Sequence, residues 1–326
     1  MRTLGWLRLA VLMAGLALLF VPVAHAAPIG NLKQFRVPTA NGNPKAITPA
    51  SDGNLWFTES HVNPPQIENH HIGRITPSGA VTEFLVCQFC FPNDIVQGAD
   101  GILYFTKSDP ALGRITTAGQ VLPDVQMPNS LANGNGLASH GDDIWMTAFN
   151  THSLWRYNVV TGDITEFAVP TPGANTFDVV VDTNGGVWFT EADFPGQIGR
   201  LDPQTGLVSE TPVQGSPRQI TVASDDAIWF TERFDNAVGR LDPATNNVTM
   251  FPLPAGSGPE GIAAGPSGSV WFTQSVAGNI ARMTPDGTLT QGKSVRGSEP
   301  FGITVANGTP WYTELSANKI ASLALR

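Results

Sequence analysis

The sequence has little charge, and positive charge is the scarcer sign. Charged residues make up 14% of the 326 residues, with 18 Lys and Arg against 27 Asp and Glu and a formal net charge of −9. Because an acidic surface repels phosphate groups, we expect neither nucleic acid nor an anionic lipid surface as a partner. The composition instead includes 34 Gly and 26 Pro. These residues form tight turns, which favours many short strands over helices.

Cysteine is also scarce, with only Cys87 and Cys90 in the motif C-Q-F-C. A redox motif would lie between a strand and a helix, a context that this part of the sequence does not offer. Two cysteines alone are a weak set of metal ligands. We therefore predict a local disulfide between them, formed in an oxidising compartment.

Long hydrophobic runs are missing after the first segment of the chain. Two arginines and an apolar run at 9–23 precede the small residues A-H-A at 24–26. This predicts a signal peptide over residues 1–26 with cleavage after Ala26, the alternative being an uncleaved membrane anchor. No later stretch reaches the ~20 apolar residues of a membrane span. Residues 27–326 are then expected to form one domain that is periplasmic or secreted, with no membrane span.

One short pattern recurs seven times along the chain. An aromatic residue opens the run W-F-T-E, or a close variant, at intervals of 48, 41, 43, 41, 42 and 40 residues. An apolar segment such as A-I-T precedes each run, and I-G-R or a variant follows it. Four short strands per repeat predict an all-β fold, a seven-bladed β-propeller with four-stranded blades. The anchor residues are Trp56, Tyr104, Trp145, Trp188, Trp229, Trp271 and Trp311.

The two ends of the chain indicate how the ring closes. The last repeat stops after its third strand, whereas L-K-Q-F-R-V-P at 32–38 matches the fourth strand I-T-E-F-A-V-P at 164–170. We expect strand 32–38 to complete the last blade, which would protect the sheet edges and leave a monomer. A solenoid is the alternative, but the polar caps that it needs are not visible. In the ring, the repeated Trp should pack between blades, and the Arg of I-G-R should bond to the neighbouring blade.

The residues just before the innermost strand of each blade should meet at one mouth of the central channel. They are polar and varied while the scaffold around them repeats, so we interpret them as a candidate site for a small-molecule or peptide-like ligand. An unselected wet channel is the alternative. The positions are Lys45, Asn93, Asn135, Phe177, Arg218, Glu260 and Phe301, with Asp178 directly after Phe177.

The residue that ends the second strand of each blade should share this face. For most blades, a solvated strand end is sufficient to explain it. Glu314 differs because Glu299 precedes the inner strand of the same blade. Two carboxylates at one rim could hold a hard divalent cation such as Mg2+. The strand-end positions are Glu59, Lys107, Ala148, Glu191, Glu232, Gln274 and Glu314.

The pattern P-x-[AG]-I-T, W-F-T-E, I-G-R-[IL]-[TD]-P and T-E-F resembles the virginiamycin B lyase (streptogramin lyase) family over all of residues 27–326. The resemblance implies a seven-bladed propeller that linearises streptogramin B antibiotics by elimination. It also implies an Mg2+ ion on two Glu, which fall on Glu299 and Glu314, and a pair of His near the channel mouth. By motif those histidines fall on Glu260 and Phe301, so this sequence departs from the family there.

The departure changes the expected chemistry. Elimination needs a base for the carbon acid and an acid for the leaving oxygen, and losing one such group costs a factor of ~10²–10⁴ in rate. Phe301 can serve as neither, and Glu260 is a base candidate only if burial raises its pKa. We therefore expect a ligand-binding propeller with a rim that can hold a metal and little antibiotic-lyase activity. The alternatives are an active Mg2+-dependent lyase of cyclic esters and a Ca2+-dependent lactonase-like hydrolase, with ion ligands from Asn93, Asn135, Asp178 and Glu260.

The histidines cluster elsewhere. His61, His70 and His71 belong to a long loop expected over residues 60–71, near the two cysteines of the next segment. Such a loop could cap the mouth or bind a transition metal, or it could be a polar lid without ligands. No Gly-x-Ser-x-Gly motif and no phosphate-binding Gly-rich loop is present.

Overall fold

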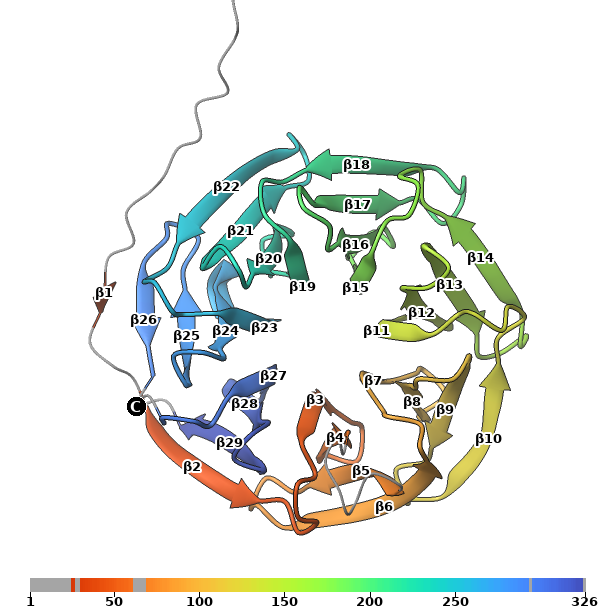
Figure 1. Cartoon of the computed structure of the whole chain (residues 1–326), viewed down its shortest axis with the longest axis horizontal. Helices are drawn as coiled ribbons and strands as arrows, with labels where there is room; N and C mark the ends of the chain where they lie inside the picture. The colour runs from red at the N-terminus through yellow and green to blue at the C-terminus, as the bar shows by residue number, and fades with distance from the viewer. Residues whose placement is uncertain (1–24, 27–29, 61–68, 293–294, 325–326) are drawn as a thin grey trace, which may run out of the picture.

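The structure, a computed structural model, describes residues 25–26, 30–60, 69–292 and 295–324. Seven antiparallel sheets surround a central channel, and the strands of each sheet follow one another from the channel outward (Figure 1). This confirms the seven-bladed β-propeller. Within the described ranges the only other regular element is the 3-10 turn η1 (Pro266–Gly268), and no helix is long and apolar enough to span a membrane.

The strands run from the innermost to the outermost in each blade. Blade 1 has β3 (Pro44–Pro49), β4 (Leu55–Glu59), β5 (Asn69–Ile75) and β6 (Val81–Gln88). Blade 2 has β7 (Ile95–Gln97), β8 (Leu103–Thr106), β9 (Ala111–Ile115) and β10 (Val121–Gln126). Blade 3 has β11 (Gly134–His140), β12 (Asp143–Ala148), β13 (Ser153–Asn158) and β14 (Ile164–Ala168). Blade 4 has β15 (Thr176–Val181), β16 (Val187–Glu191), β17 (Gln197–Leu201) and β18 (Val208–Pro212).

The remaining blades follow the same order. Blade 5 has β19 (Pro217–Val222), β20 (Ile228–Glu232), β21 (Ala237–Asp242) and β22 (Asn247–Pro252). Blade 6 has β23 (Pro259–Ala264), β24 (Val270–Gln274), β25 (Asn279–Met283) and β26 (Leu289–Gln291). Blade 7 has β27 (Pro300–Ala306), β28 (Thr309–Glu314), β29 (Lys319–Ala324) and β2 (Asn31–Arg36).

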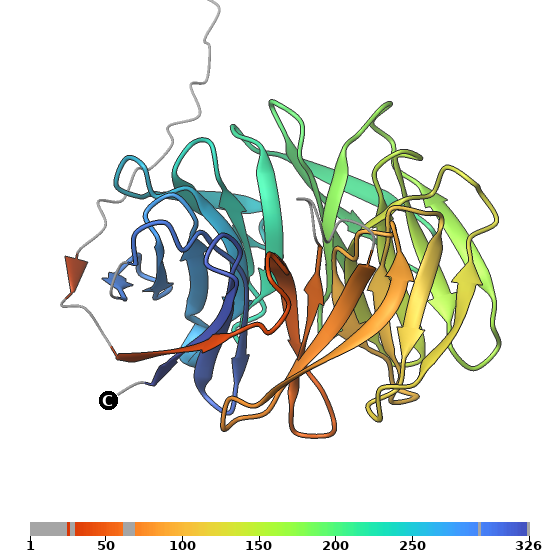
Figure 2. The same cartoon turned by 60° about the horizontal axis from the view of Figure 1, so that its bottom comes forward.

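Blade 7 is built from both ends of the chain. β2 pairs with β29 in an antiparallel register, so the strand expected at 32–38 completes the last blade and closes the ring. The two strands lie side by side in both views (Figure 1, Figure 2). β1 (His25–Ala26) adds a parallel strand to the outer edge of blade 6. The rest of the signal peptide predicted over residues 1–26 lies outside the described residues.

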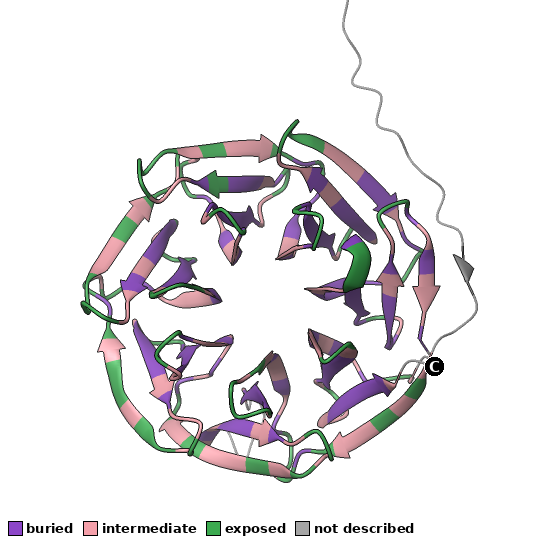
Figure 3. Cartoon of the chain, turned by 180° about the vertical axis from the view of Figure 1, so that it is seen from behind, coloured by how far each residue is buried: buried purple, intermediate pink, exposed green. Residues whose placement is uncertain are grey.

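The core is divided into seven clusters, one at each junction between blades. Trp56 of blade 1 packs against Ile95 and Phe105 of blade 2, and the anchor aromatic of every other blade likewise packs into the following blade. Burial is therefore concentrated in the second and third strands of each blade, whereas exposed residues lie in the turns and along most of the outer strands (Figure 3). The glycine of I-G-R repeats because a Cβ at Gly73 would lie only 2.1 Å from the ring of Phe57. The expected packing of Trp between blades is confirmed.

The arginine of I-G-R behaves differently from the expectation. Arg74 does reach the next blade, where its Nη1 donates to the carbonyl of Thr117 at 3.3 Å. Its guanidinium, however, also lies 5.6 Å from the centroid of Trp56, its partner across the strands. Arg156 and Arg200 cover the Trp of their own blades in the same way. The prediction of a general link between blades is therefore wrong, because strand register places this Arg over its own Trp.

The threonine of W-F-T-E supplies the repeated link between blades. In blade 7, the hydroxyl of Thr313 accepts a hydrogen bond from Gly302 N (2.9 Å) and donates one to the carbonyl of Lys45 in blade 1 (2.7 Å). The same pair of bonds occurs at all seven junctions, and all seven threonines are fully buried. Since the carbonyl partner always lies at or just before the start of the inner strand of the next blade, this threonine sets the position of the channel mouth.

Candidate functional site at the channel mouth

The seven positions predicted to meet at the channel do lie together, and we call Lys45, Asn93, Asn135, Phe177, Arg218, Glu260 and Phe301 the mouth ring. Its first half is a directional chain of hydrogen bonds. Lys45 Nζ donates to Asn93 Oδ1, Asn93 Nδ2 donates to Asn135 Oδ1 (2.5 Å), and Asn135 Nδ2 donates to the carbonyl of Phe177 (2.8 Å). These residues and Phe301 line a hollow of about 30 Å³, above a channel cavity of about 300 Å³.

The second half of the mouth ring is an ion-pair cluster. Glu260 is fully buried, and its carboxylate contacts Arg218 Nη2 (3.5 Å) and Arg233 Nη1 (2.8 Å). The Arg218 guanidinium stacks on Phe177, 4.1 Å from the ring centroid. Lys45 Nζ lies 5.4 Å from the centroid of Phe301 and completes the ring. Both oxygens of Glu260 are thus engaged by guanidinium groups, and its role as a base stays a prediction.

Arg233 is the residue of this site that the sequence did not single out. It follows W-F-T-E in blade 5, in the loop between β20 and β21. Most of the equivalent positions in the other blades carry small residues, so a break in the internal repeat was the available signal. The equivalents are Ser60, Ser108, Phe149, Ala192, Ser275 and Leu315.

Two carboxyl groups lie one layer deeper in the channel. Asp178 accepts hydrogen bonds from Val179 N (2.9 Å) and from Ile220 N of the next blade (3.1 Å). Asp94 binds two backbone N–H groups in the same manner. Burial, followed by the charge of Asp94, raises the pKa of Asp178 to about 8, and burial raises the pKa of Asp94 to about 6. Asp178, predicted to bind ligand, therefore uses its carboxyl group to join blades 4 and 5.

Lys45 is the ammonium group of the mouth ring. Burial lowers its pKa, while the neighbouring carboxyl groups of Glu260 and Asp94 act in the opposite direction and Arg218 lowers it further. Burial is the largest of these causes, so the net effect lowers the pKa of Lys45, and the facing acids offset it only in part. The guanidinium groups of Arg218 and Arg233, beside Glu260, add positive charge at the channel mouth.

The residues that end the second strands are buried rather than solvated, so the expectation of a solvated strand end is wrong. Glu191 shows the reason. Gln197 Nε2 donates to its Oε2 (3.2 Å), and Glu210 holds Thr171 of the loop that crosses from blade 3 into blade 4. Burial, followed by the charge of Glu210, raises the pKa of Glu191 to about 8. These carboxyl groups belong to the scaffold beneath the crossing loops.

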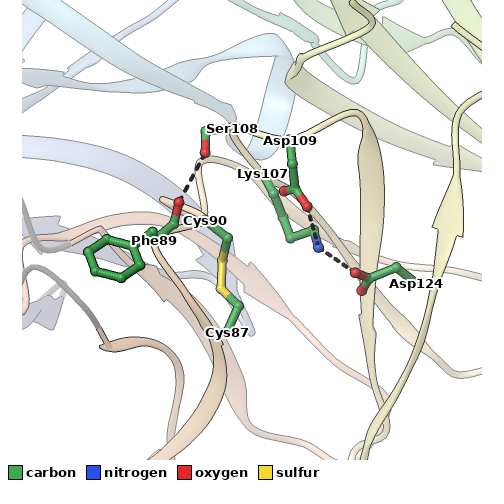
Figure 4. Close-up of a disulfide and its surroundings, with 7 residues drawn as sticks. All are labelled: Cys87, Phe89, Cys90, Lys107, Ser108, Asp109 and Asp124. Carbon is green, nitrogen blue, oxygen red and sulfur yellow. Dashed lines mark hydrogen bonds and ion pairs between the residues drawn. A yellow bond between two sulfur atoms is a disulfide. The ribbon is translucent and has the colours of Figure 1, made fainter. Parts of the chain in front are cut away.

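In blades 2 and 6, as in blade 4, the outer strand complements this buried position. Lys107 faces Asp124 at 2.5 Å and also contacts Asp109 at 3.2 Å (Figure 4). Gln274 accepts a hydrogen bond from Gln291 (3.1 Å). A lysine that ends the second strand thus faces an acid, and a glutamine faces a glutamine. This pairing indicates that the residue ending the second strand contributes mainly to stability in most blades.

The two cysteines form a disulfide between β6 and the following loop (Figure 4). The hydroxyl of Ser108 donates to the carbonyl of Phe89 inside this loop (3.5 Å). His70 is buried in β5 with its ring edge-on to Phe91, 4.5 Å between centroids. His70 and His71 are therefore strand residues, and the expected loop over 60–71 is shorter; His61 lies outside the described residues.

Glu299 and Glu314 lie at the rim of blade 7. Their backbones are adjacent, since Pro300 pairs with Glu314 and Leu315 N donates to the carbonyl of Glu299 (3.0 Å). Glu314 Oε2 accepts from Gln34 Nε2 (2.6 Å), and Glu299 Oε2 accepts from the hydroxyl of Ser316. Glu314 Oε1 is buried without a hydrogen-bond partner among the described residues, which suits an oxygen ligand for a cation.

Glu299 distinguishes this rim from the others. Glu191 and Glu232 also have a buried Oε1 that lacks a hydrogen-bond partner in the described part of the chain, so the orphaned oxygen alone is not specific. No other blade, however, has an acid at the position equivalent to Glu299. The equivalents of Glu299 are Asn43, Phe91, Asn133, Asn175, Ser216 and Gly258. Two carboxylates fit Mg2+ because this ion keeps several waters; the described residues hold no cluster of three or more His, Cys, Asp or Glu.

The comparisons with known proteins agree with this architecture. Residues 22–206 and 139–326 match the virginiamycin B lyase family. A virginiamycin B lyase of Nocardia farcinica is 36% identical over 148 residues, which are 45% of this chain and about half (50%) of that relative.

Solved structures extend the likeness over the whole ring. A streptogramin B lyase has a TM-score of 0.82 at 26% identity, covering 91% of this chain and 98% of its own. The virginiamycin B lyase of Staphylococcus aureus has a TM-score of 0.82 at 27% identity, with 91% and 99% covered. A catalytically inactive His-to-Ala variant of that enzyme, solved with quinupristin, has a TM-score of 0.81 at 27% identity, again with 91% and 99% covered. The chain belongs to the virginiamycin B lyase family.

Proposed function

We propose that this protein is an exported propeller that binds a peptide-like ligand over the mouth ring, with Mg2+ at Glu299 and Glu314, and that it lacks the acid–base pair of a streptogramin lyase. The proposal depends on the two residues that stand where the family resemblance implies histidines, Glu260 and Phe301. Glu260 is held by two guanidinium groups and Phe301 lies beneath Lys45. None of the described residues that line the mouth hollow is a histidine.

The relatives support this separation of binding from catalysis. The Staphylococcus aureus variant that was solved with quinupristin is inactive and carries Ala in place of a His. A family member can therefore hold such a ligand without catalytic turnover. With Phe301 at one implied His position, proton transfer at that point is lost, which typically costs ~10²–10⁴ in rate.

Mg2+ would supply positive charge for a carbonyl oxygen of the ligand when it is bound. Glu299 and Glu314 would hold it, and the amide of Gln34 would orient the Glu314 carboxylate from the outer strand. The chain's own residues then provide the rest of the recognition surface through the mouth ring.

An active Mg2+-dependent lyase is the second candidate, favoured by the family and by the paired carboxylates. A Ca2+-dependent hydrolase ranks below it. The side chains of Asn93 and Asn135 already bond within the mouth ring, and the oxygens of Asp178 accept backbone N–H groups.

The test uses quinupristin as the probe. Purified protein is titrated with it by calorimetry, and its products are followed by chromatography and mass spectrometry with Mg2+ or Ca2+. Elimination leaves the mass unchanged and hydrolysis adds one water. We expect binding and no linear product above the rate without protein. A linear isomer formed at enzyme-like rates would establish the lyase instead, and a Ca2+-dependent product one water heavier would establish the hydrolase.

A matched pair of variants tests the metal. Glu314→Gln should abolish the effect of Mg2+ on quinupristin binding. Glu232→Gln changes the same buried position in blade 5, where no second acid precedes the inner strand, and should leave that effect intact. If the two variants show the same effect of Mg2+ on quinupristin binding, the proposed Mg2+ site is wrong.

A further inference from the structure

The mouth ring has more hydrogen-bond donors than acceptors. Its one acid, Glu260, already uses both oxygens on two guanidinium groups, and Asp94 and Asp178, one layer deeper in the channel, use theirs on backbone N–H groups. The amide oxygens of Asn93 and Asn135 accept bonds from within the ring. The side-chain acceptors of the mouth ring are therefore occupied.

The surplus donors are on the arginines. A guanidinium carries five N–H groups, and the described residues engage only Nη2 of Arg218 and Nη1 of Arg233 in hydrogen bonds. Both side chains keep contact with solvent, with 23% and 29% of their surface exposed. Glu260 holds the two guanidinium groups in place from below, where it is fully buried, so their free edges are preorganised for an anion.

The charges at the mouth also favour an anionic ligand. Arg218 and Arg233 share one direct counter-ion, the Glu260 carboxylate, and the amino group of Lys45 faces Glu260 and Asp94, although the whole chain is acidic. Two half-buried rings flank these cations, since Phe177 lies under Arg218 and Phe301 under Lys45. Planar, bidentate recognition of a carboxylate is what arginine does best, and the rings offer contact to a flat apolar group beside it.

We propose that Arg218 and Arg233 bind a carboxylate group of the ligand, so that the ligand class is an acidic, peptide-like small molecule with a flat apolar group near its carboxylate. This rests on the mouth ring being the ligand site, as proposed above. It adds a charge requirement that the family resemblance does not supply.

Hippurate, an acylated glycine with an aromatic ring and a free carboxylate, is a suitable probe, and its neutral amide is the matched control ligand. Calorimetry at low salt should show hippurate binding about tenfold more tightly than the amide, the usual size of one charge-assisted hydrogen bond. Arg233→Gln should remove this preference, and Arg233→Lys, which keeps the charge, should retain part of it. Arg36→Gln, an exposed arginine on the outer strand β2, should change nothing.

Each other result overturns the inference. Equal binding of the two probes would show that the carboxylate is not recognised. If Arg36→Gln and Arg233→Gln weaken hippurate binding equally, the preference for the carboxylate reflects the net charge of the protein and not a specific site. If neither probe binds, the carboxylate subsite is wrong, and the quinupristin titration decides whether the mouth site falls with it.

Discussion

Replacing Thr313 by valine tests how the ring is held closed. Valine keeps the shape of threonine but lacks the hydroxyl, so Gly302 N–H and the carbonyl of Lys45 lose their common partner at the junction of blades 7 and 1. A buried polar group left without a partner costs about 1–3 kcal/mol. Gly302 is buried, whereas Lys45 is half-buried at the mouth, so the full penalty applies only to the Gly302 N–H. We therefore expect a total loss of about 2–4 kcal/mol.

The melting temperature measures this loss. An unfolding entropy of about 2 cal/mol/K per residue over this chain turns it into a decrease of about 3–6 °C in Tm. Circular dichroism melts of Thr313→Val, Thr313→Ser and wild type make the comparison, with Thr82→Val as the control for an exposed strand threonine. Serine should restore most of the stability because it keeps the hydroxyl. A Tm for Thr313→Val equal to that of Thr82→Val would refute the role given to the threonine ring.

Three further predictions concern pH, closure and catalysis. Because the folded pKa of Glu191 is raised to about 8 from an ordinary 4.5, the folded state keeps a proton that the unfolded chain releases, and this contribution to stability is lost as pH rises from about 5 to 8. Glu191→Gln should therefore raise the free energy of unfolding, measured by urea titration, by about 1 kcal/mol at pH 8.5, after allowance for solvent screening, and leave it unchanged at pH 5. The control Glu166→Gln, at an exposed position, should have no effect at either pH. Deleting residues 27–40 removes β2 and exposes Ile320 and Trp311, so proteolysis should degrade the whole propeller rather than trim one end. Phe301→His should raise the Mg2+-dependent linearisation of quinupristin by about 10², measured by chromatography, and an unchanged rate would show that Phe301 is not the missing group.

Repeated local features of the sequence were sufficient to predict the ring. The spacing of Trp56 and its equivalents predicts seven blades, and the match of 32–38 to other fourth strands predicts the closure seen in β2 and β29. These inferences succeed because strand period and turn chemistry are local properties that every blade must satisfy.

Burial at the rim could not be predicted in the same way. Glu191 ends a strand, and such an end is normally solvated. Only the loop carrying Thr171, which crosses from the preceding blade, covers it and pairs it with Glu210. His70 was likewise assigned to a loop, because the sequence does not reveal that β5 begins at Asn69 and buries this ring against Phe91.

The sequence by itself determined the all-β propeller, its seven blades, the way it closes and the set of positions that meet at the channel. Only the tertiary structure decided which of these side chains neutralise one another. Arg218, Arg233 and Glu260 come from separate strands and loops, and their contacts leave donors rather than acceptors facing the ligand. The energy of an electrostatic interaction depends on the distance between charges in space and not on their separation along the chain. The charge pairing at the mouth therefore cannot be predicted without the tertiary structure.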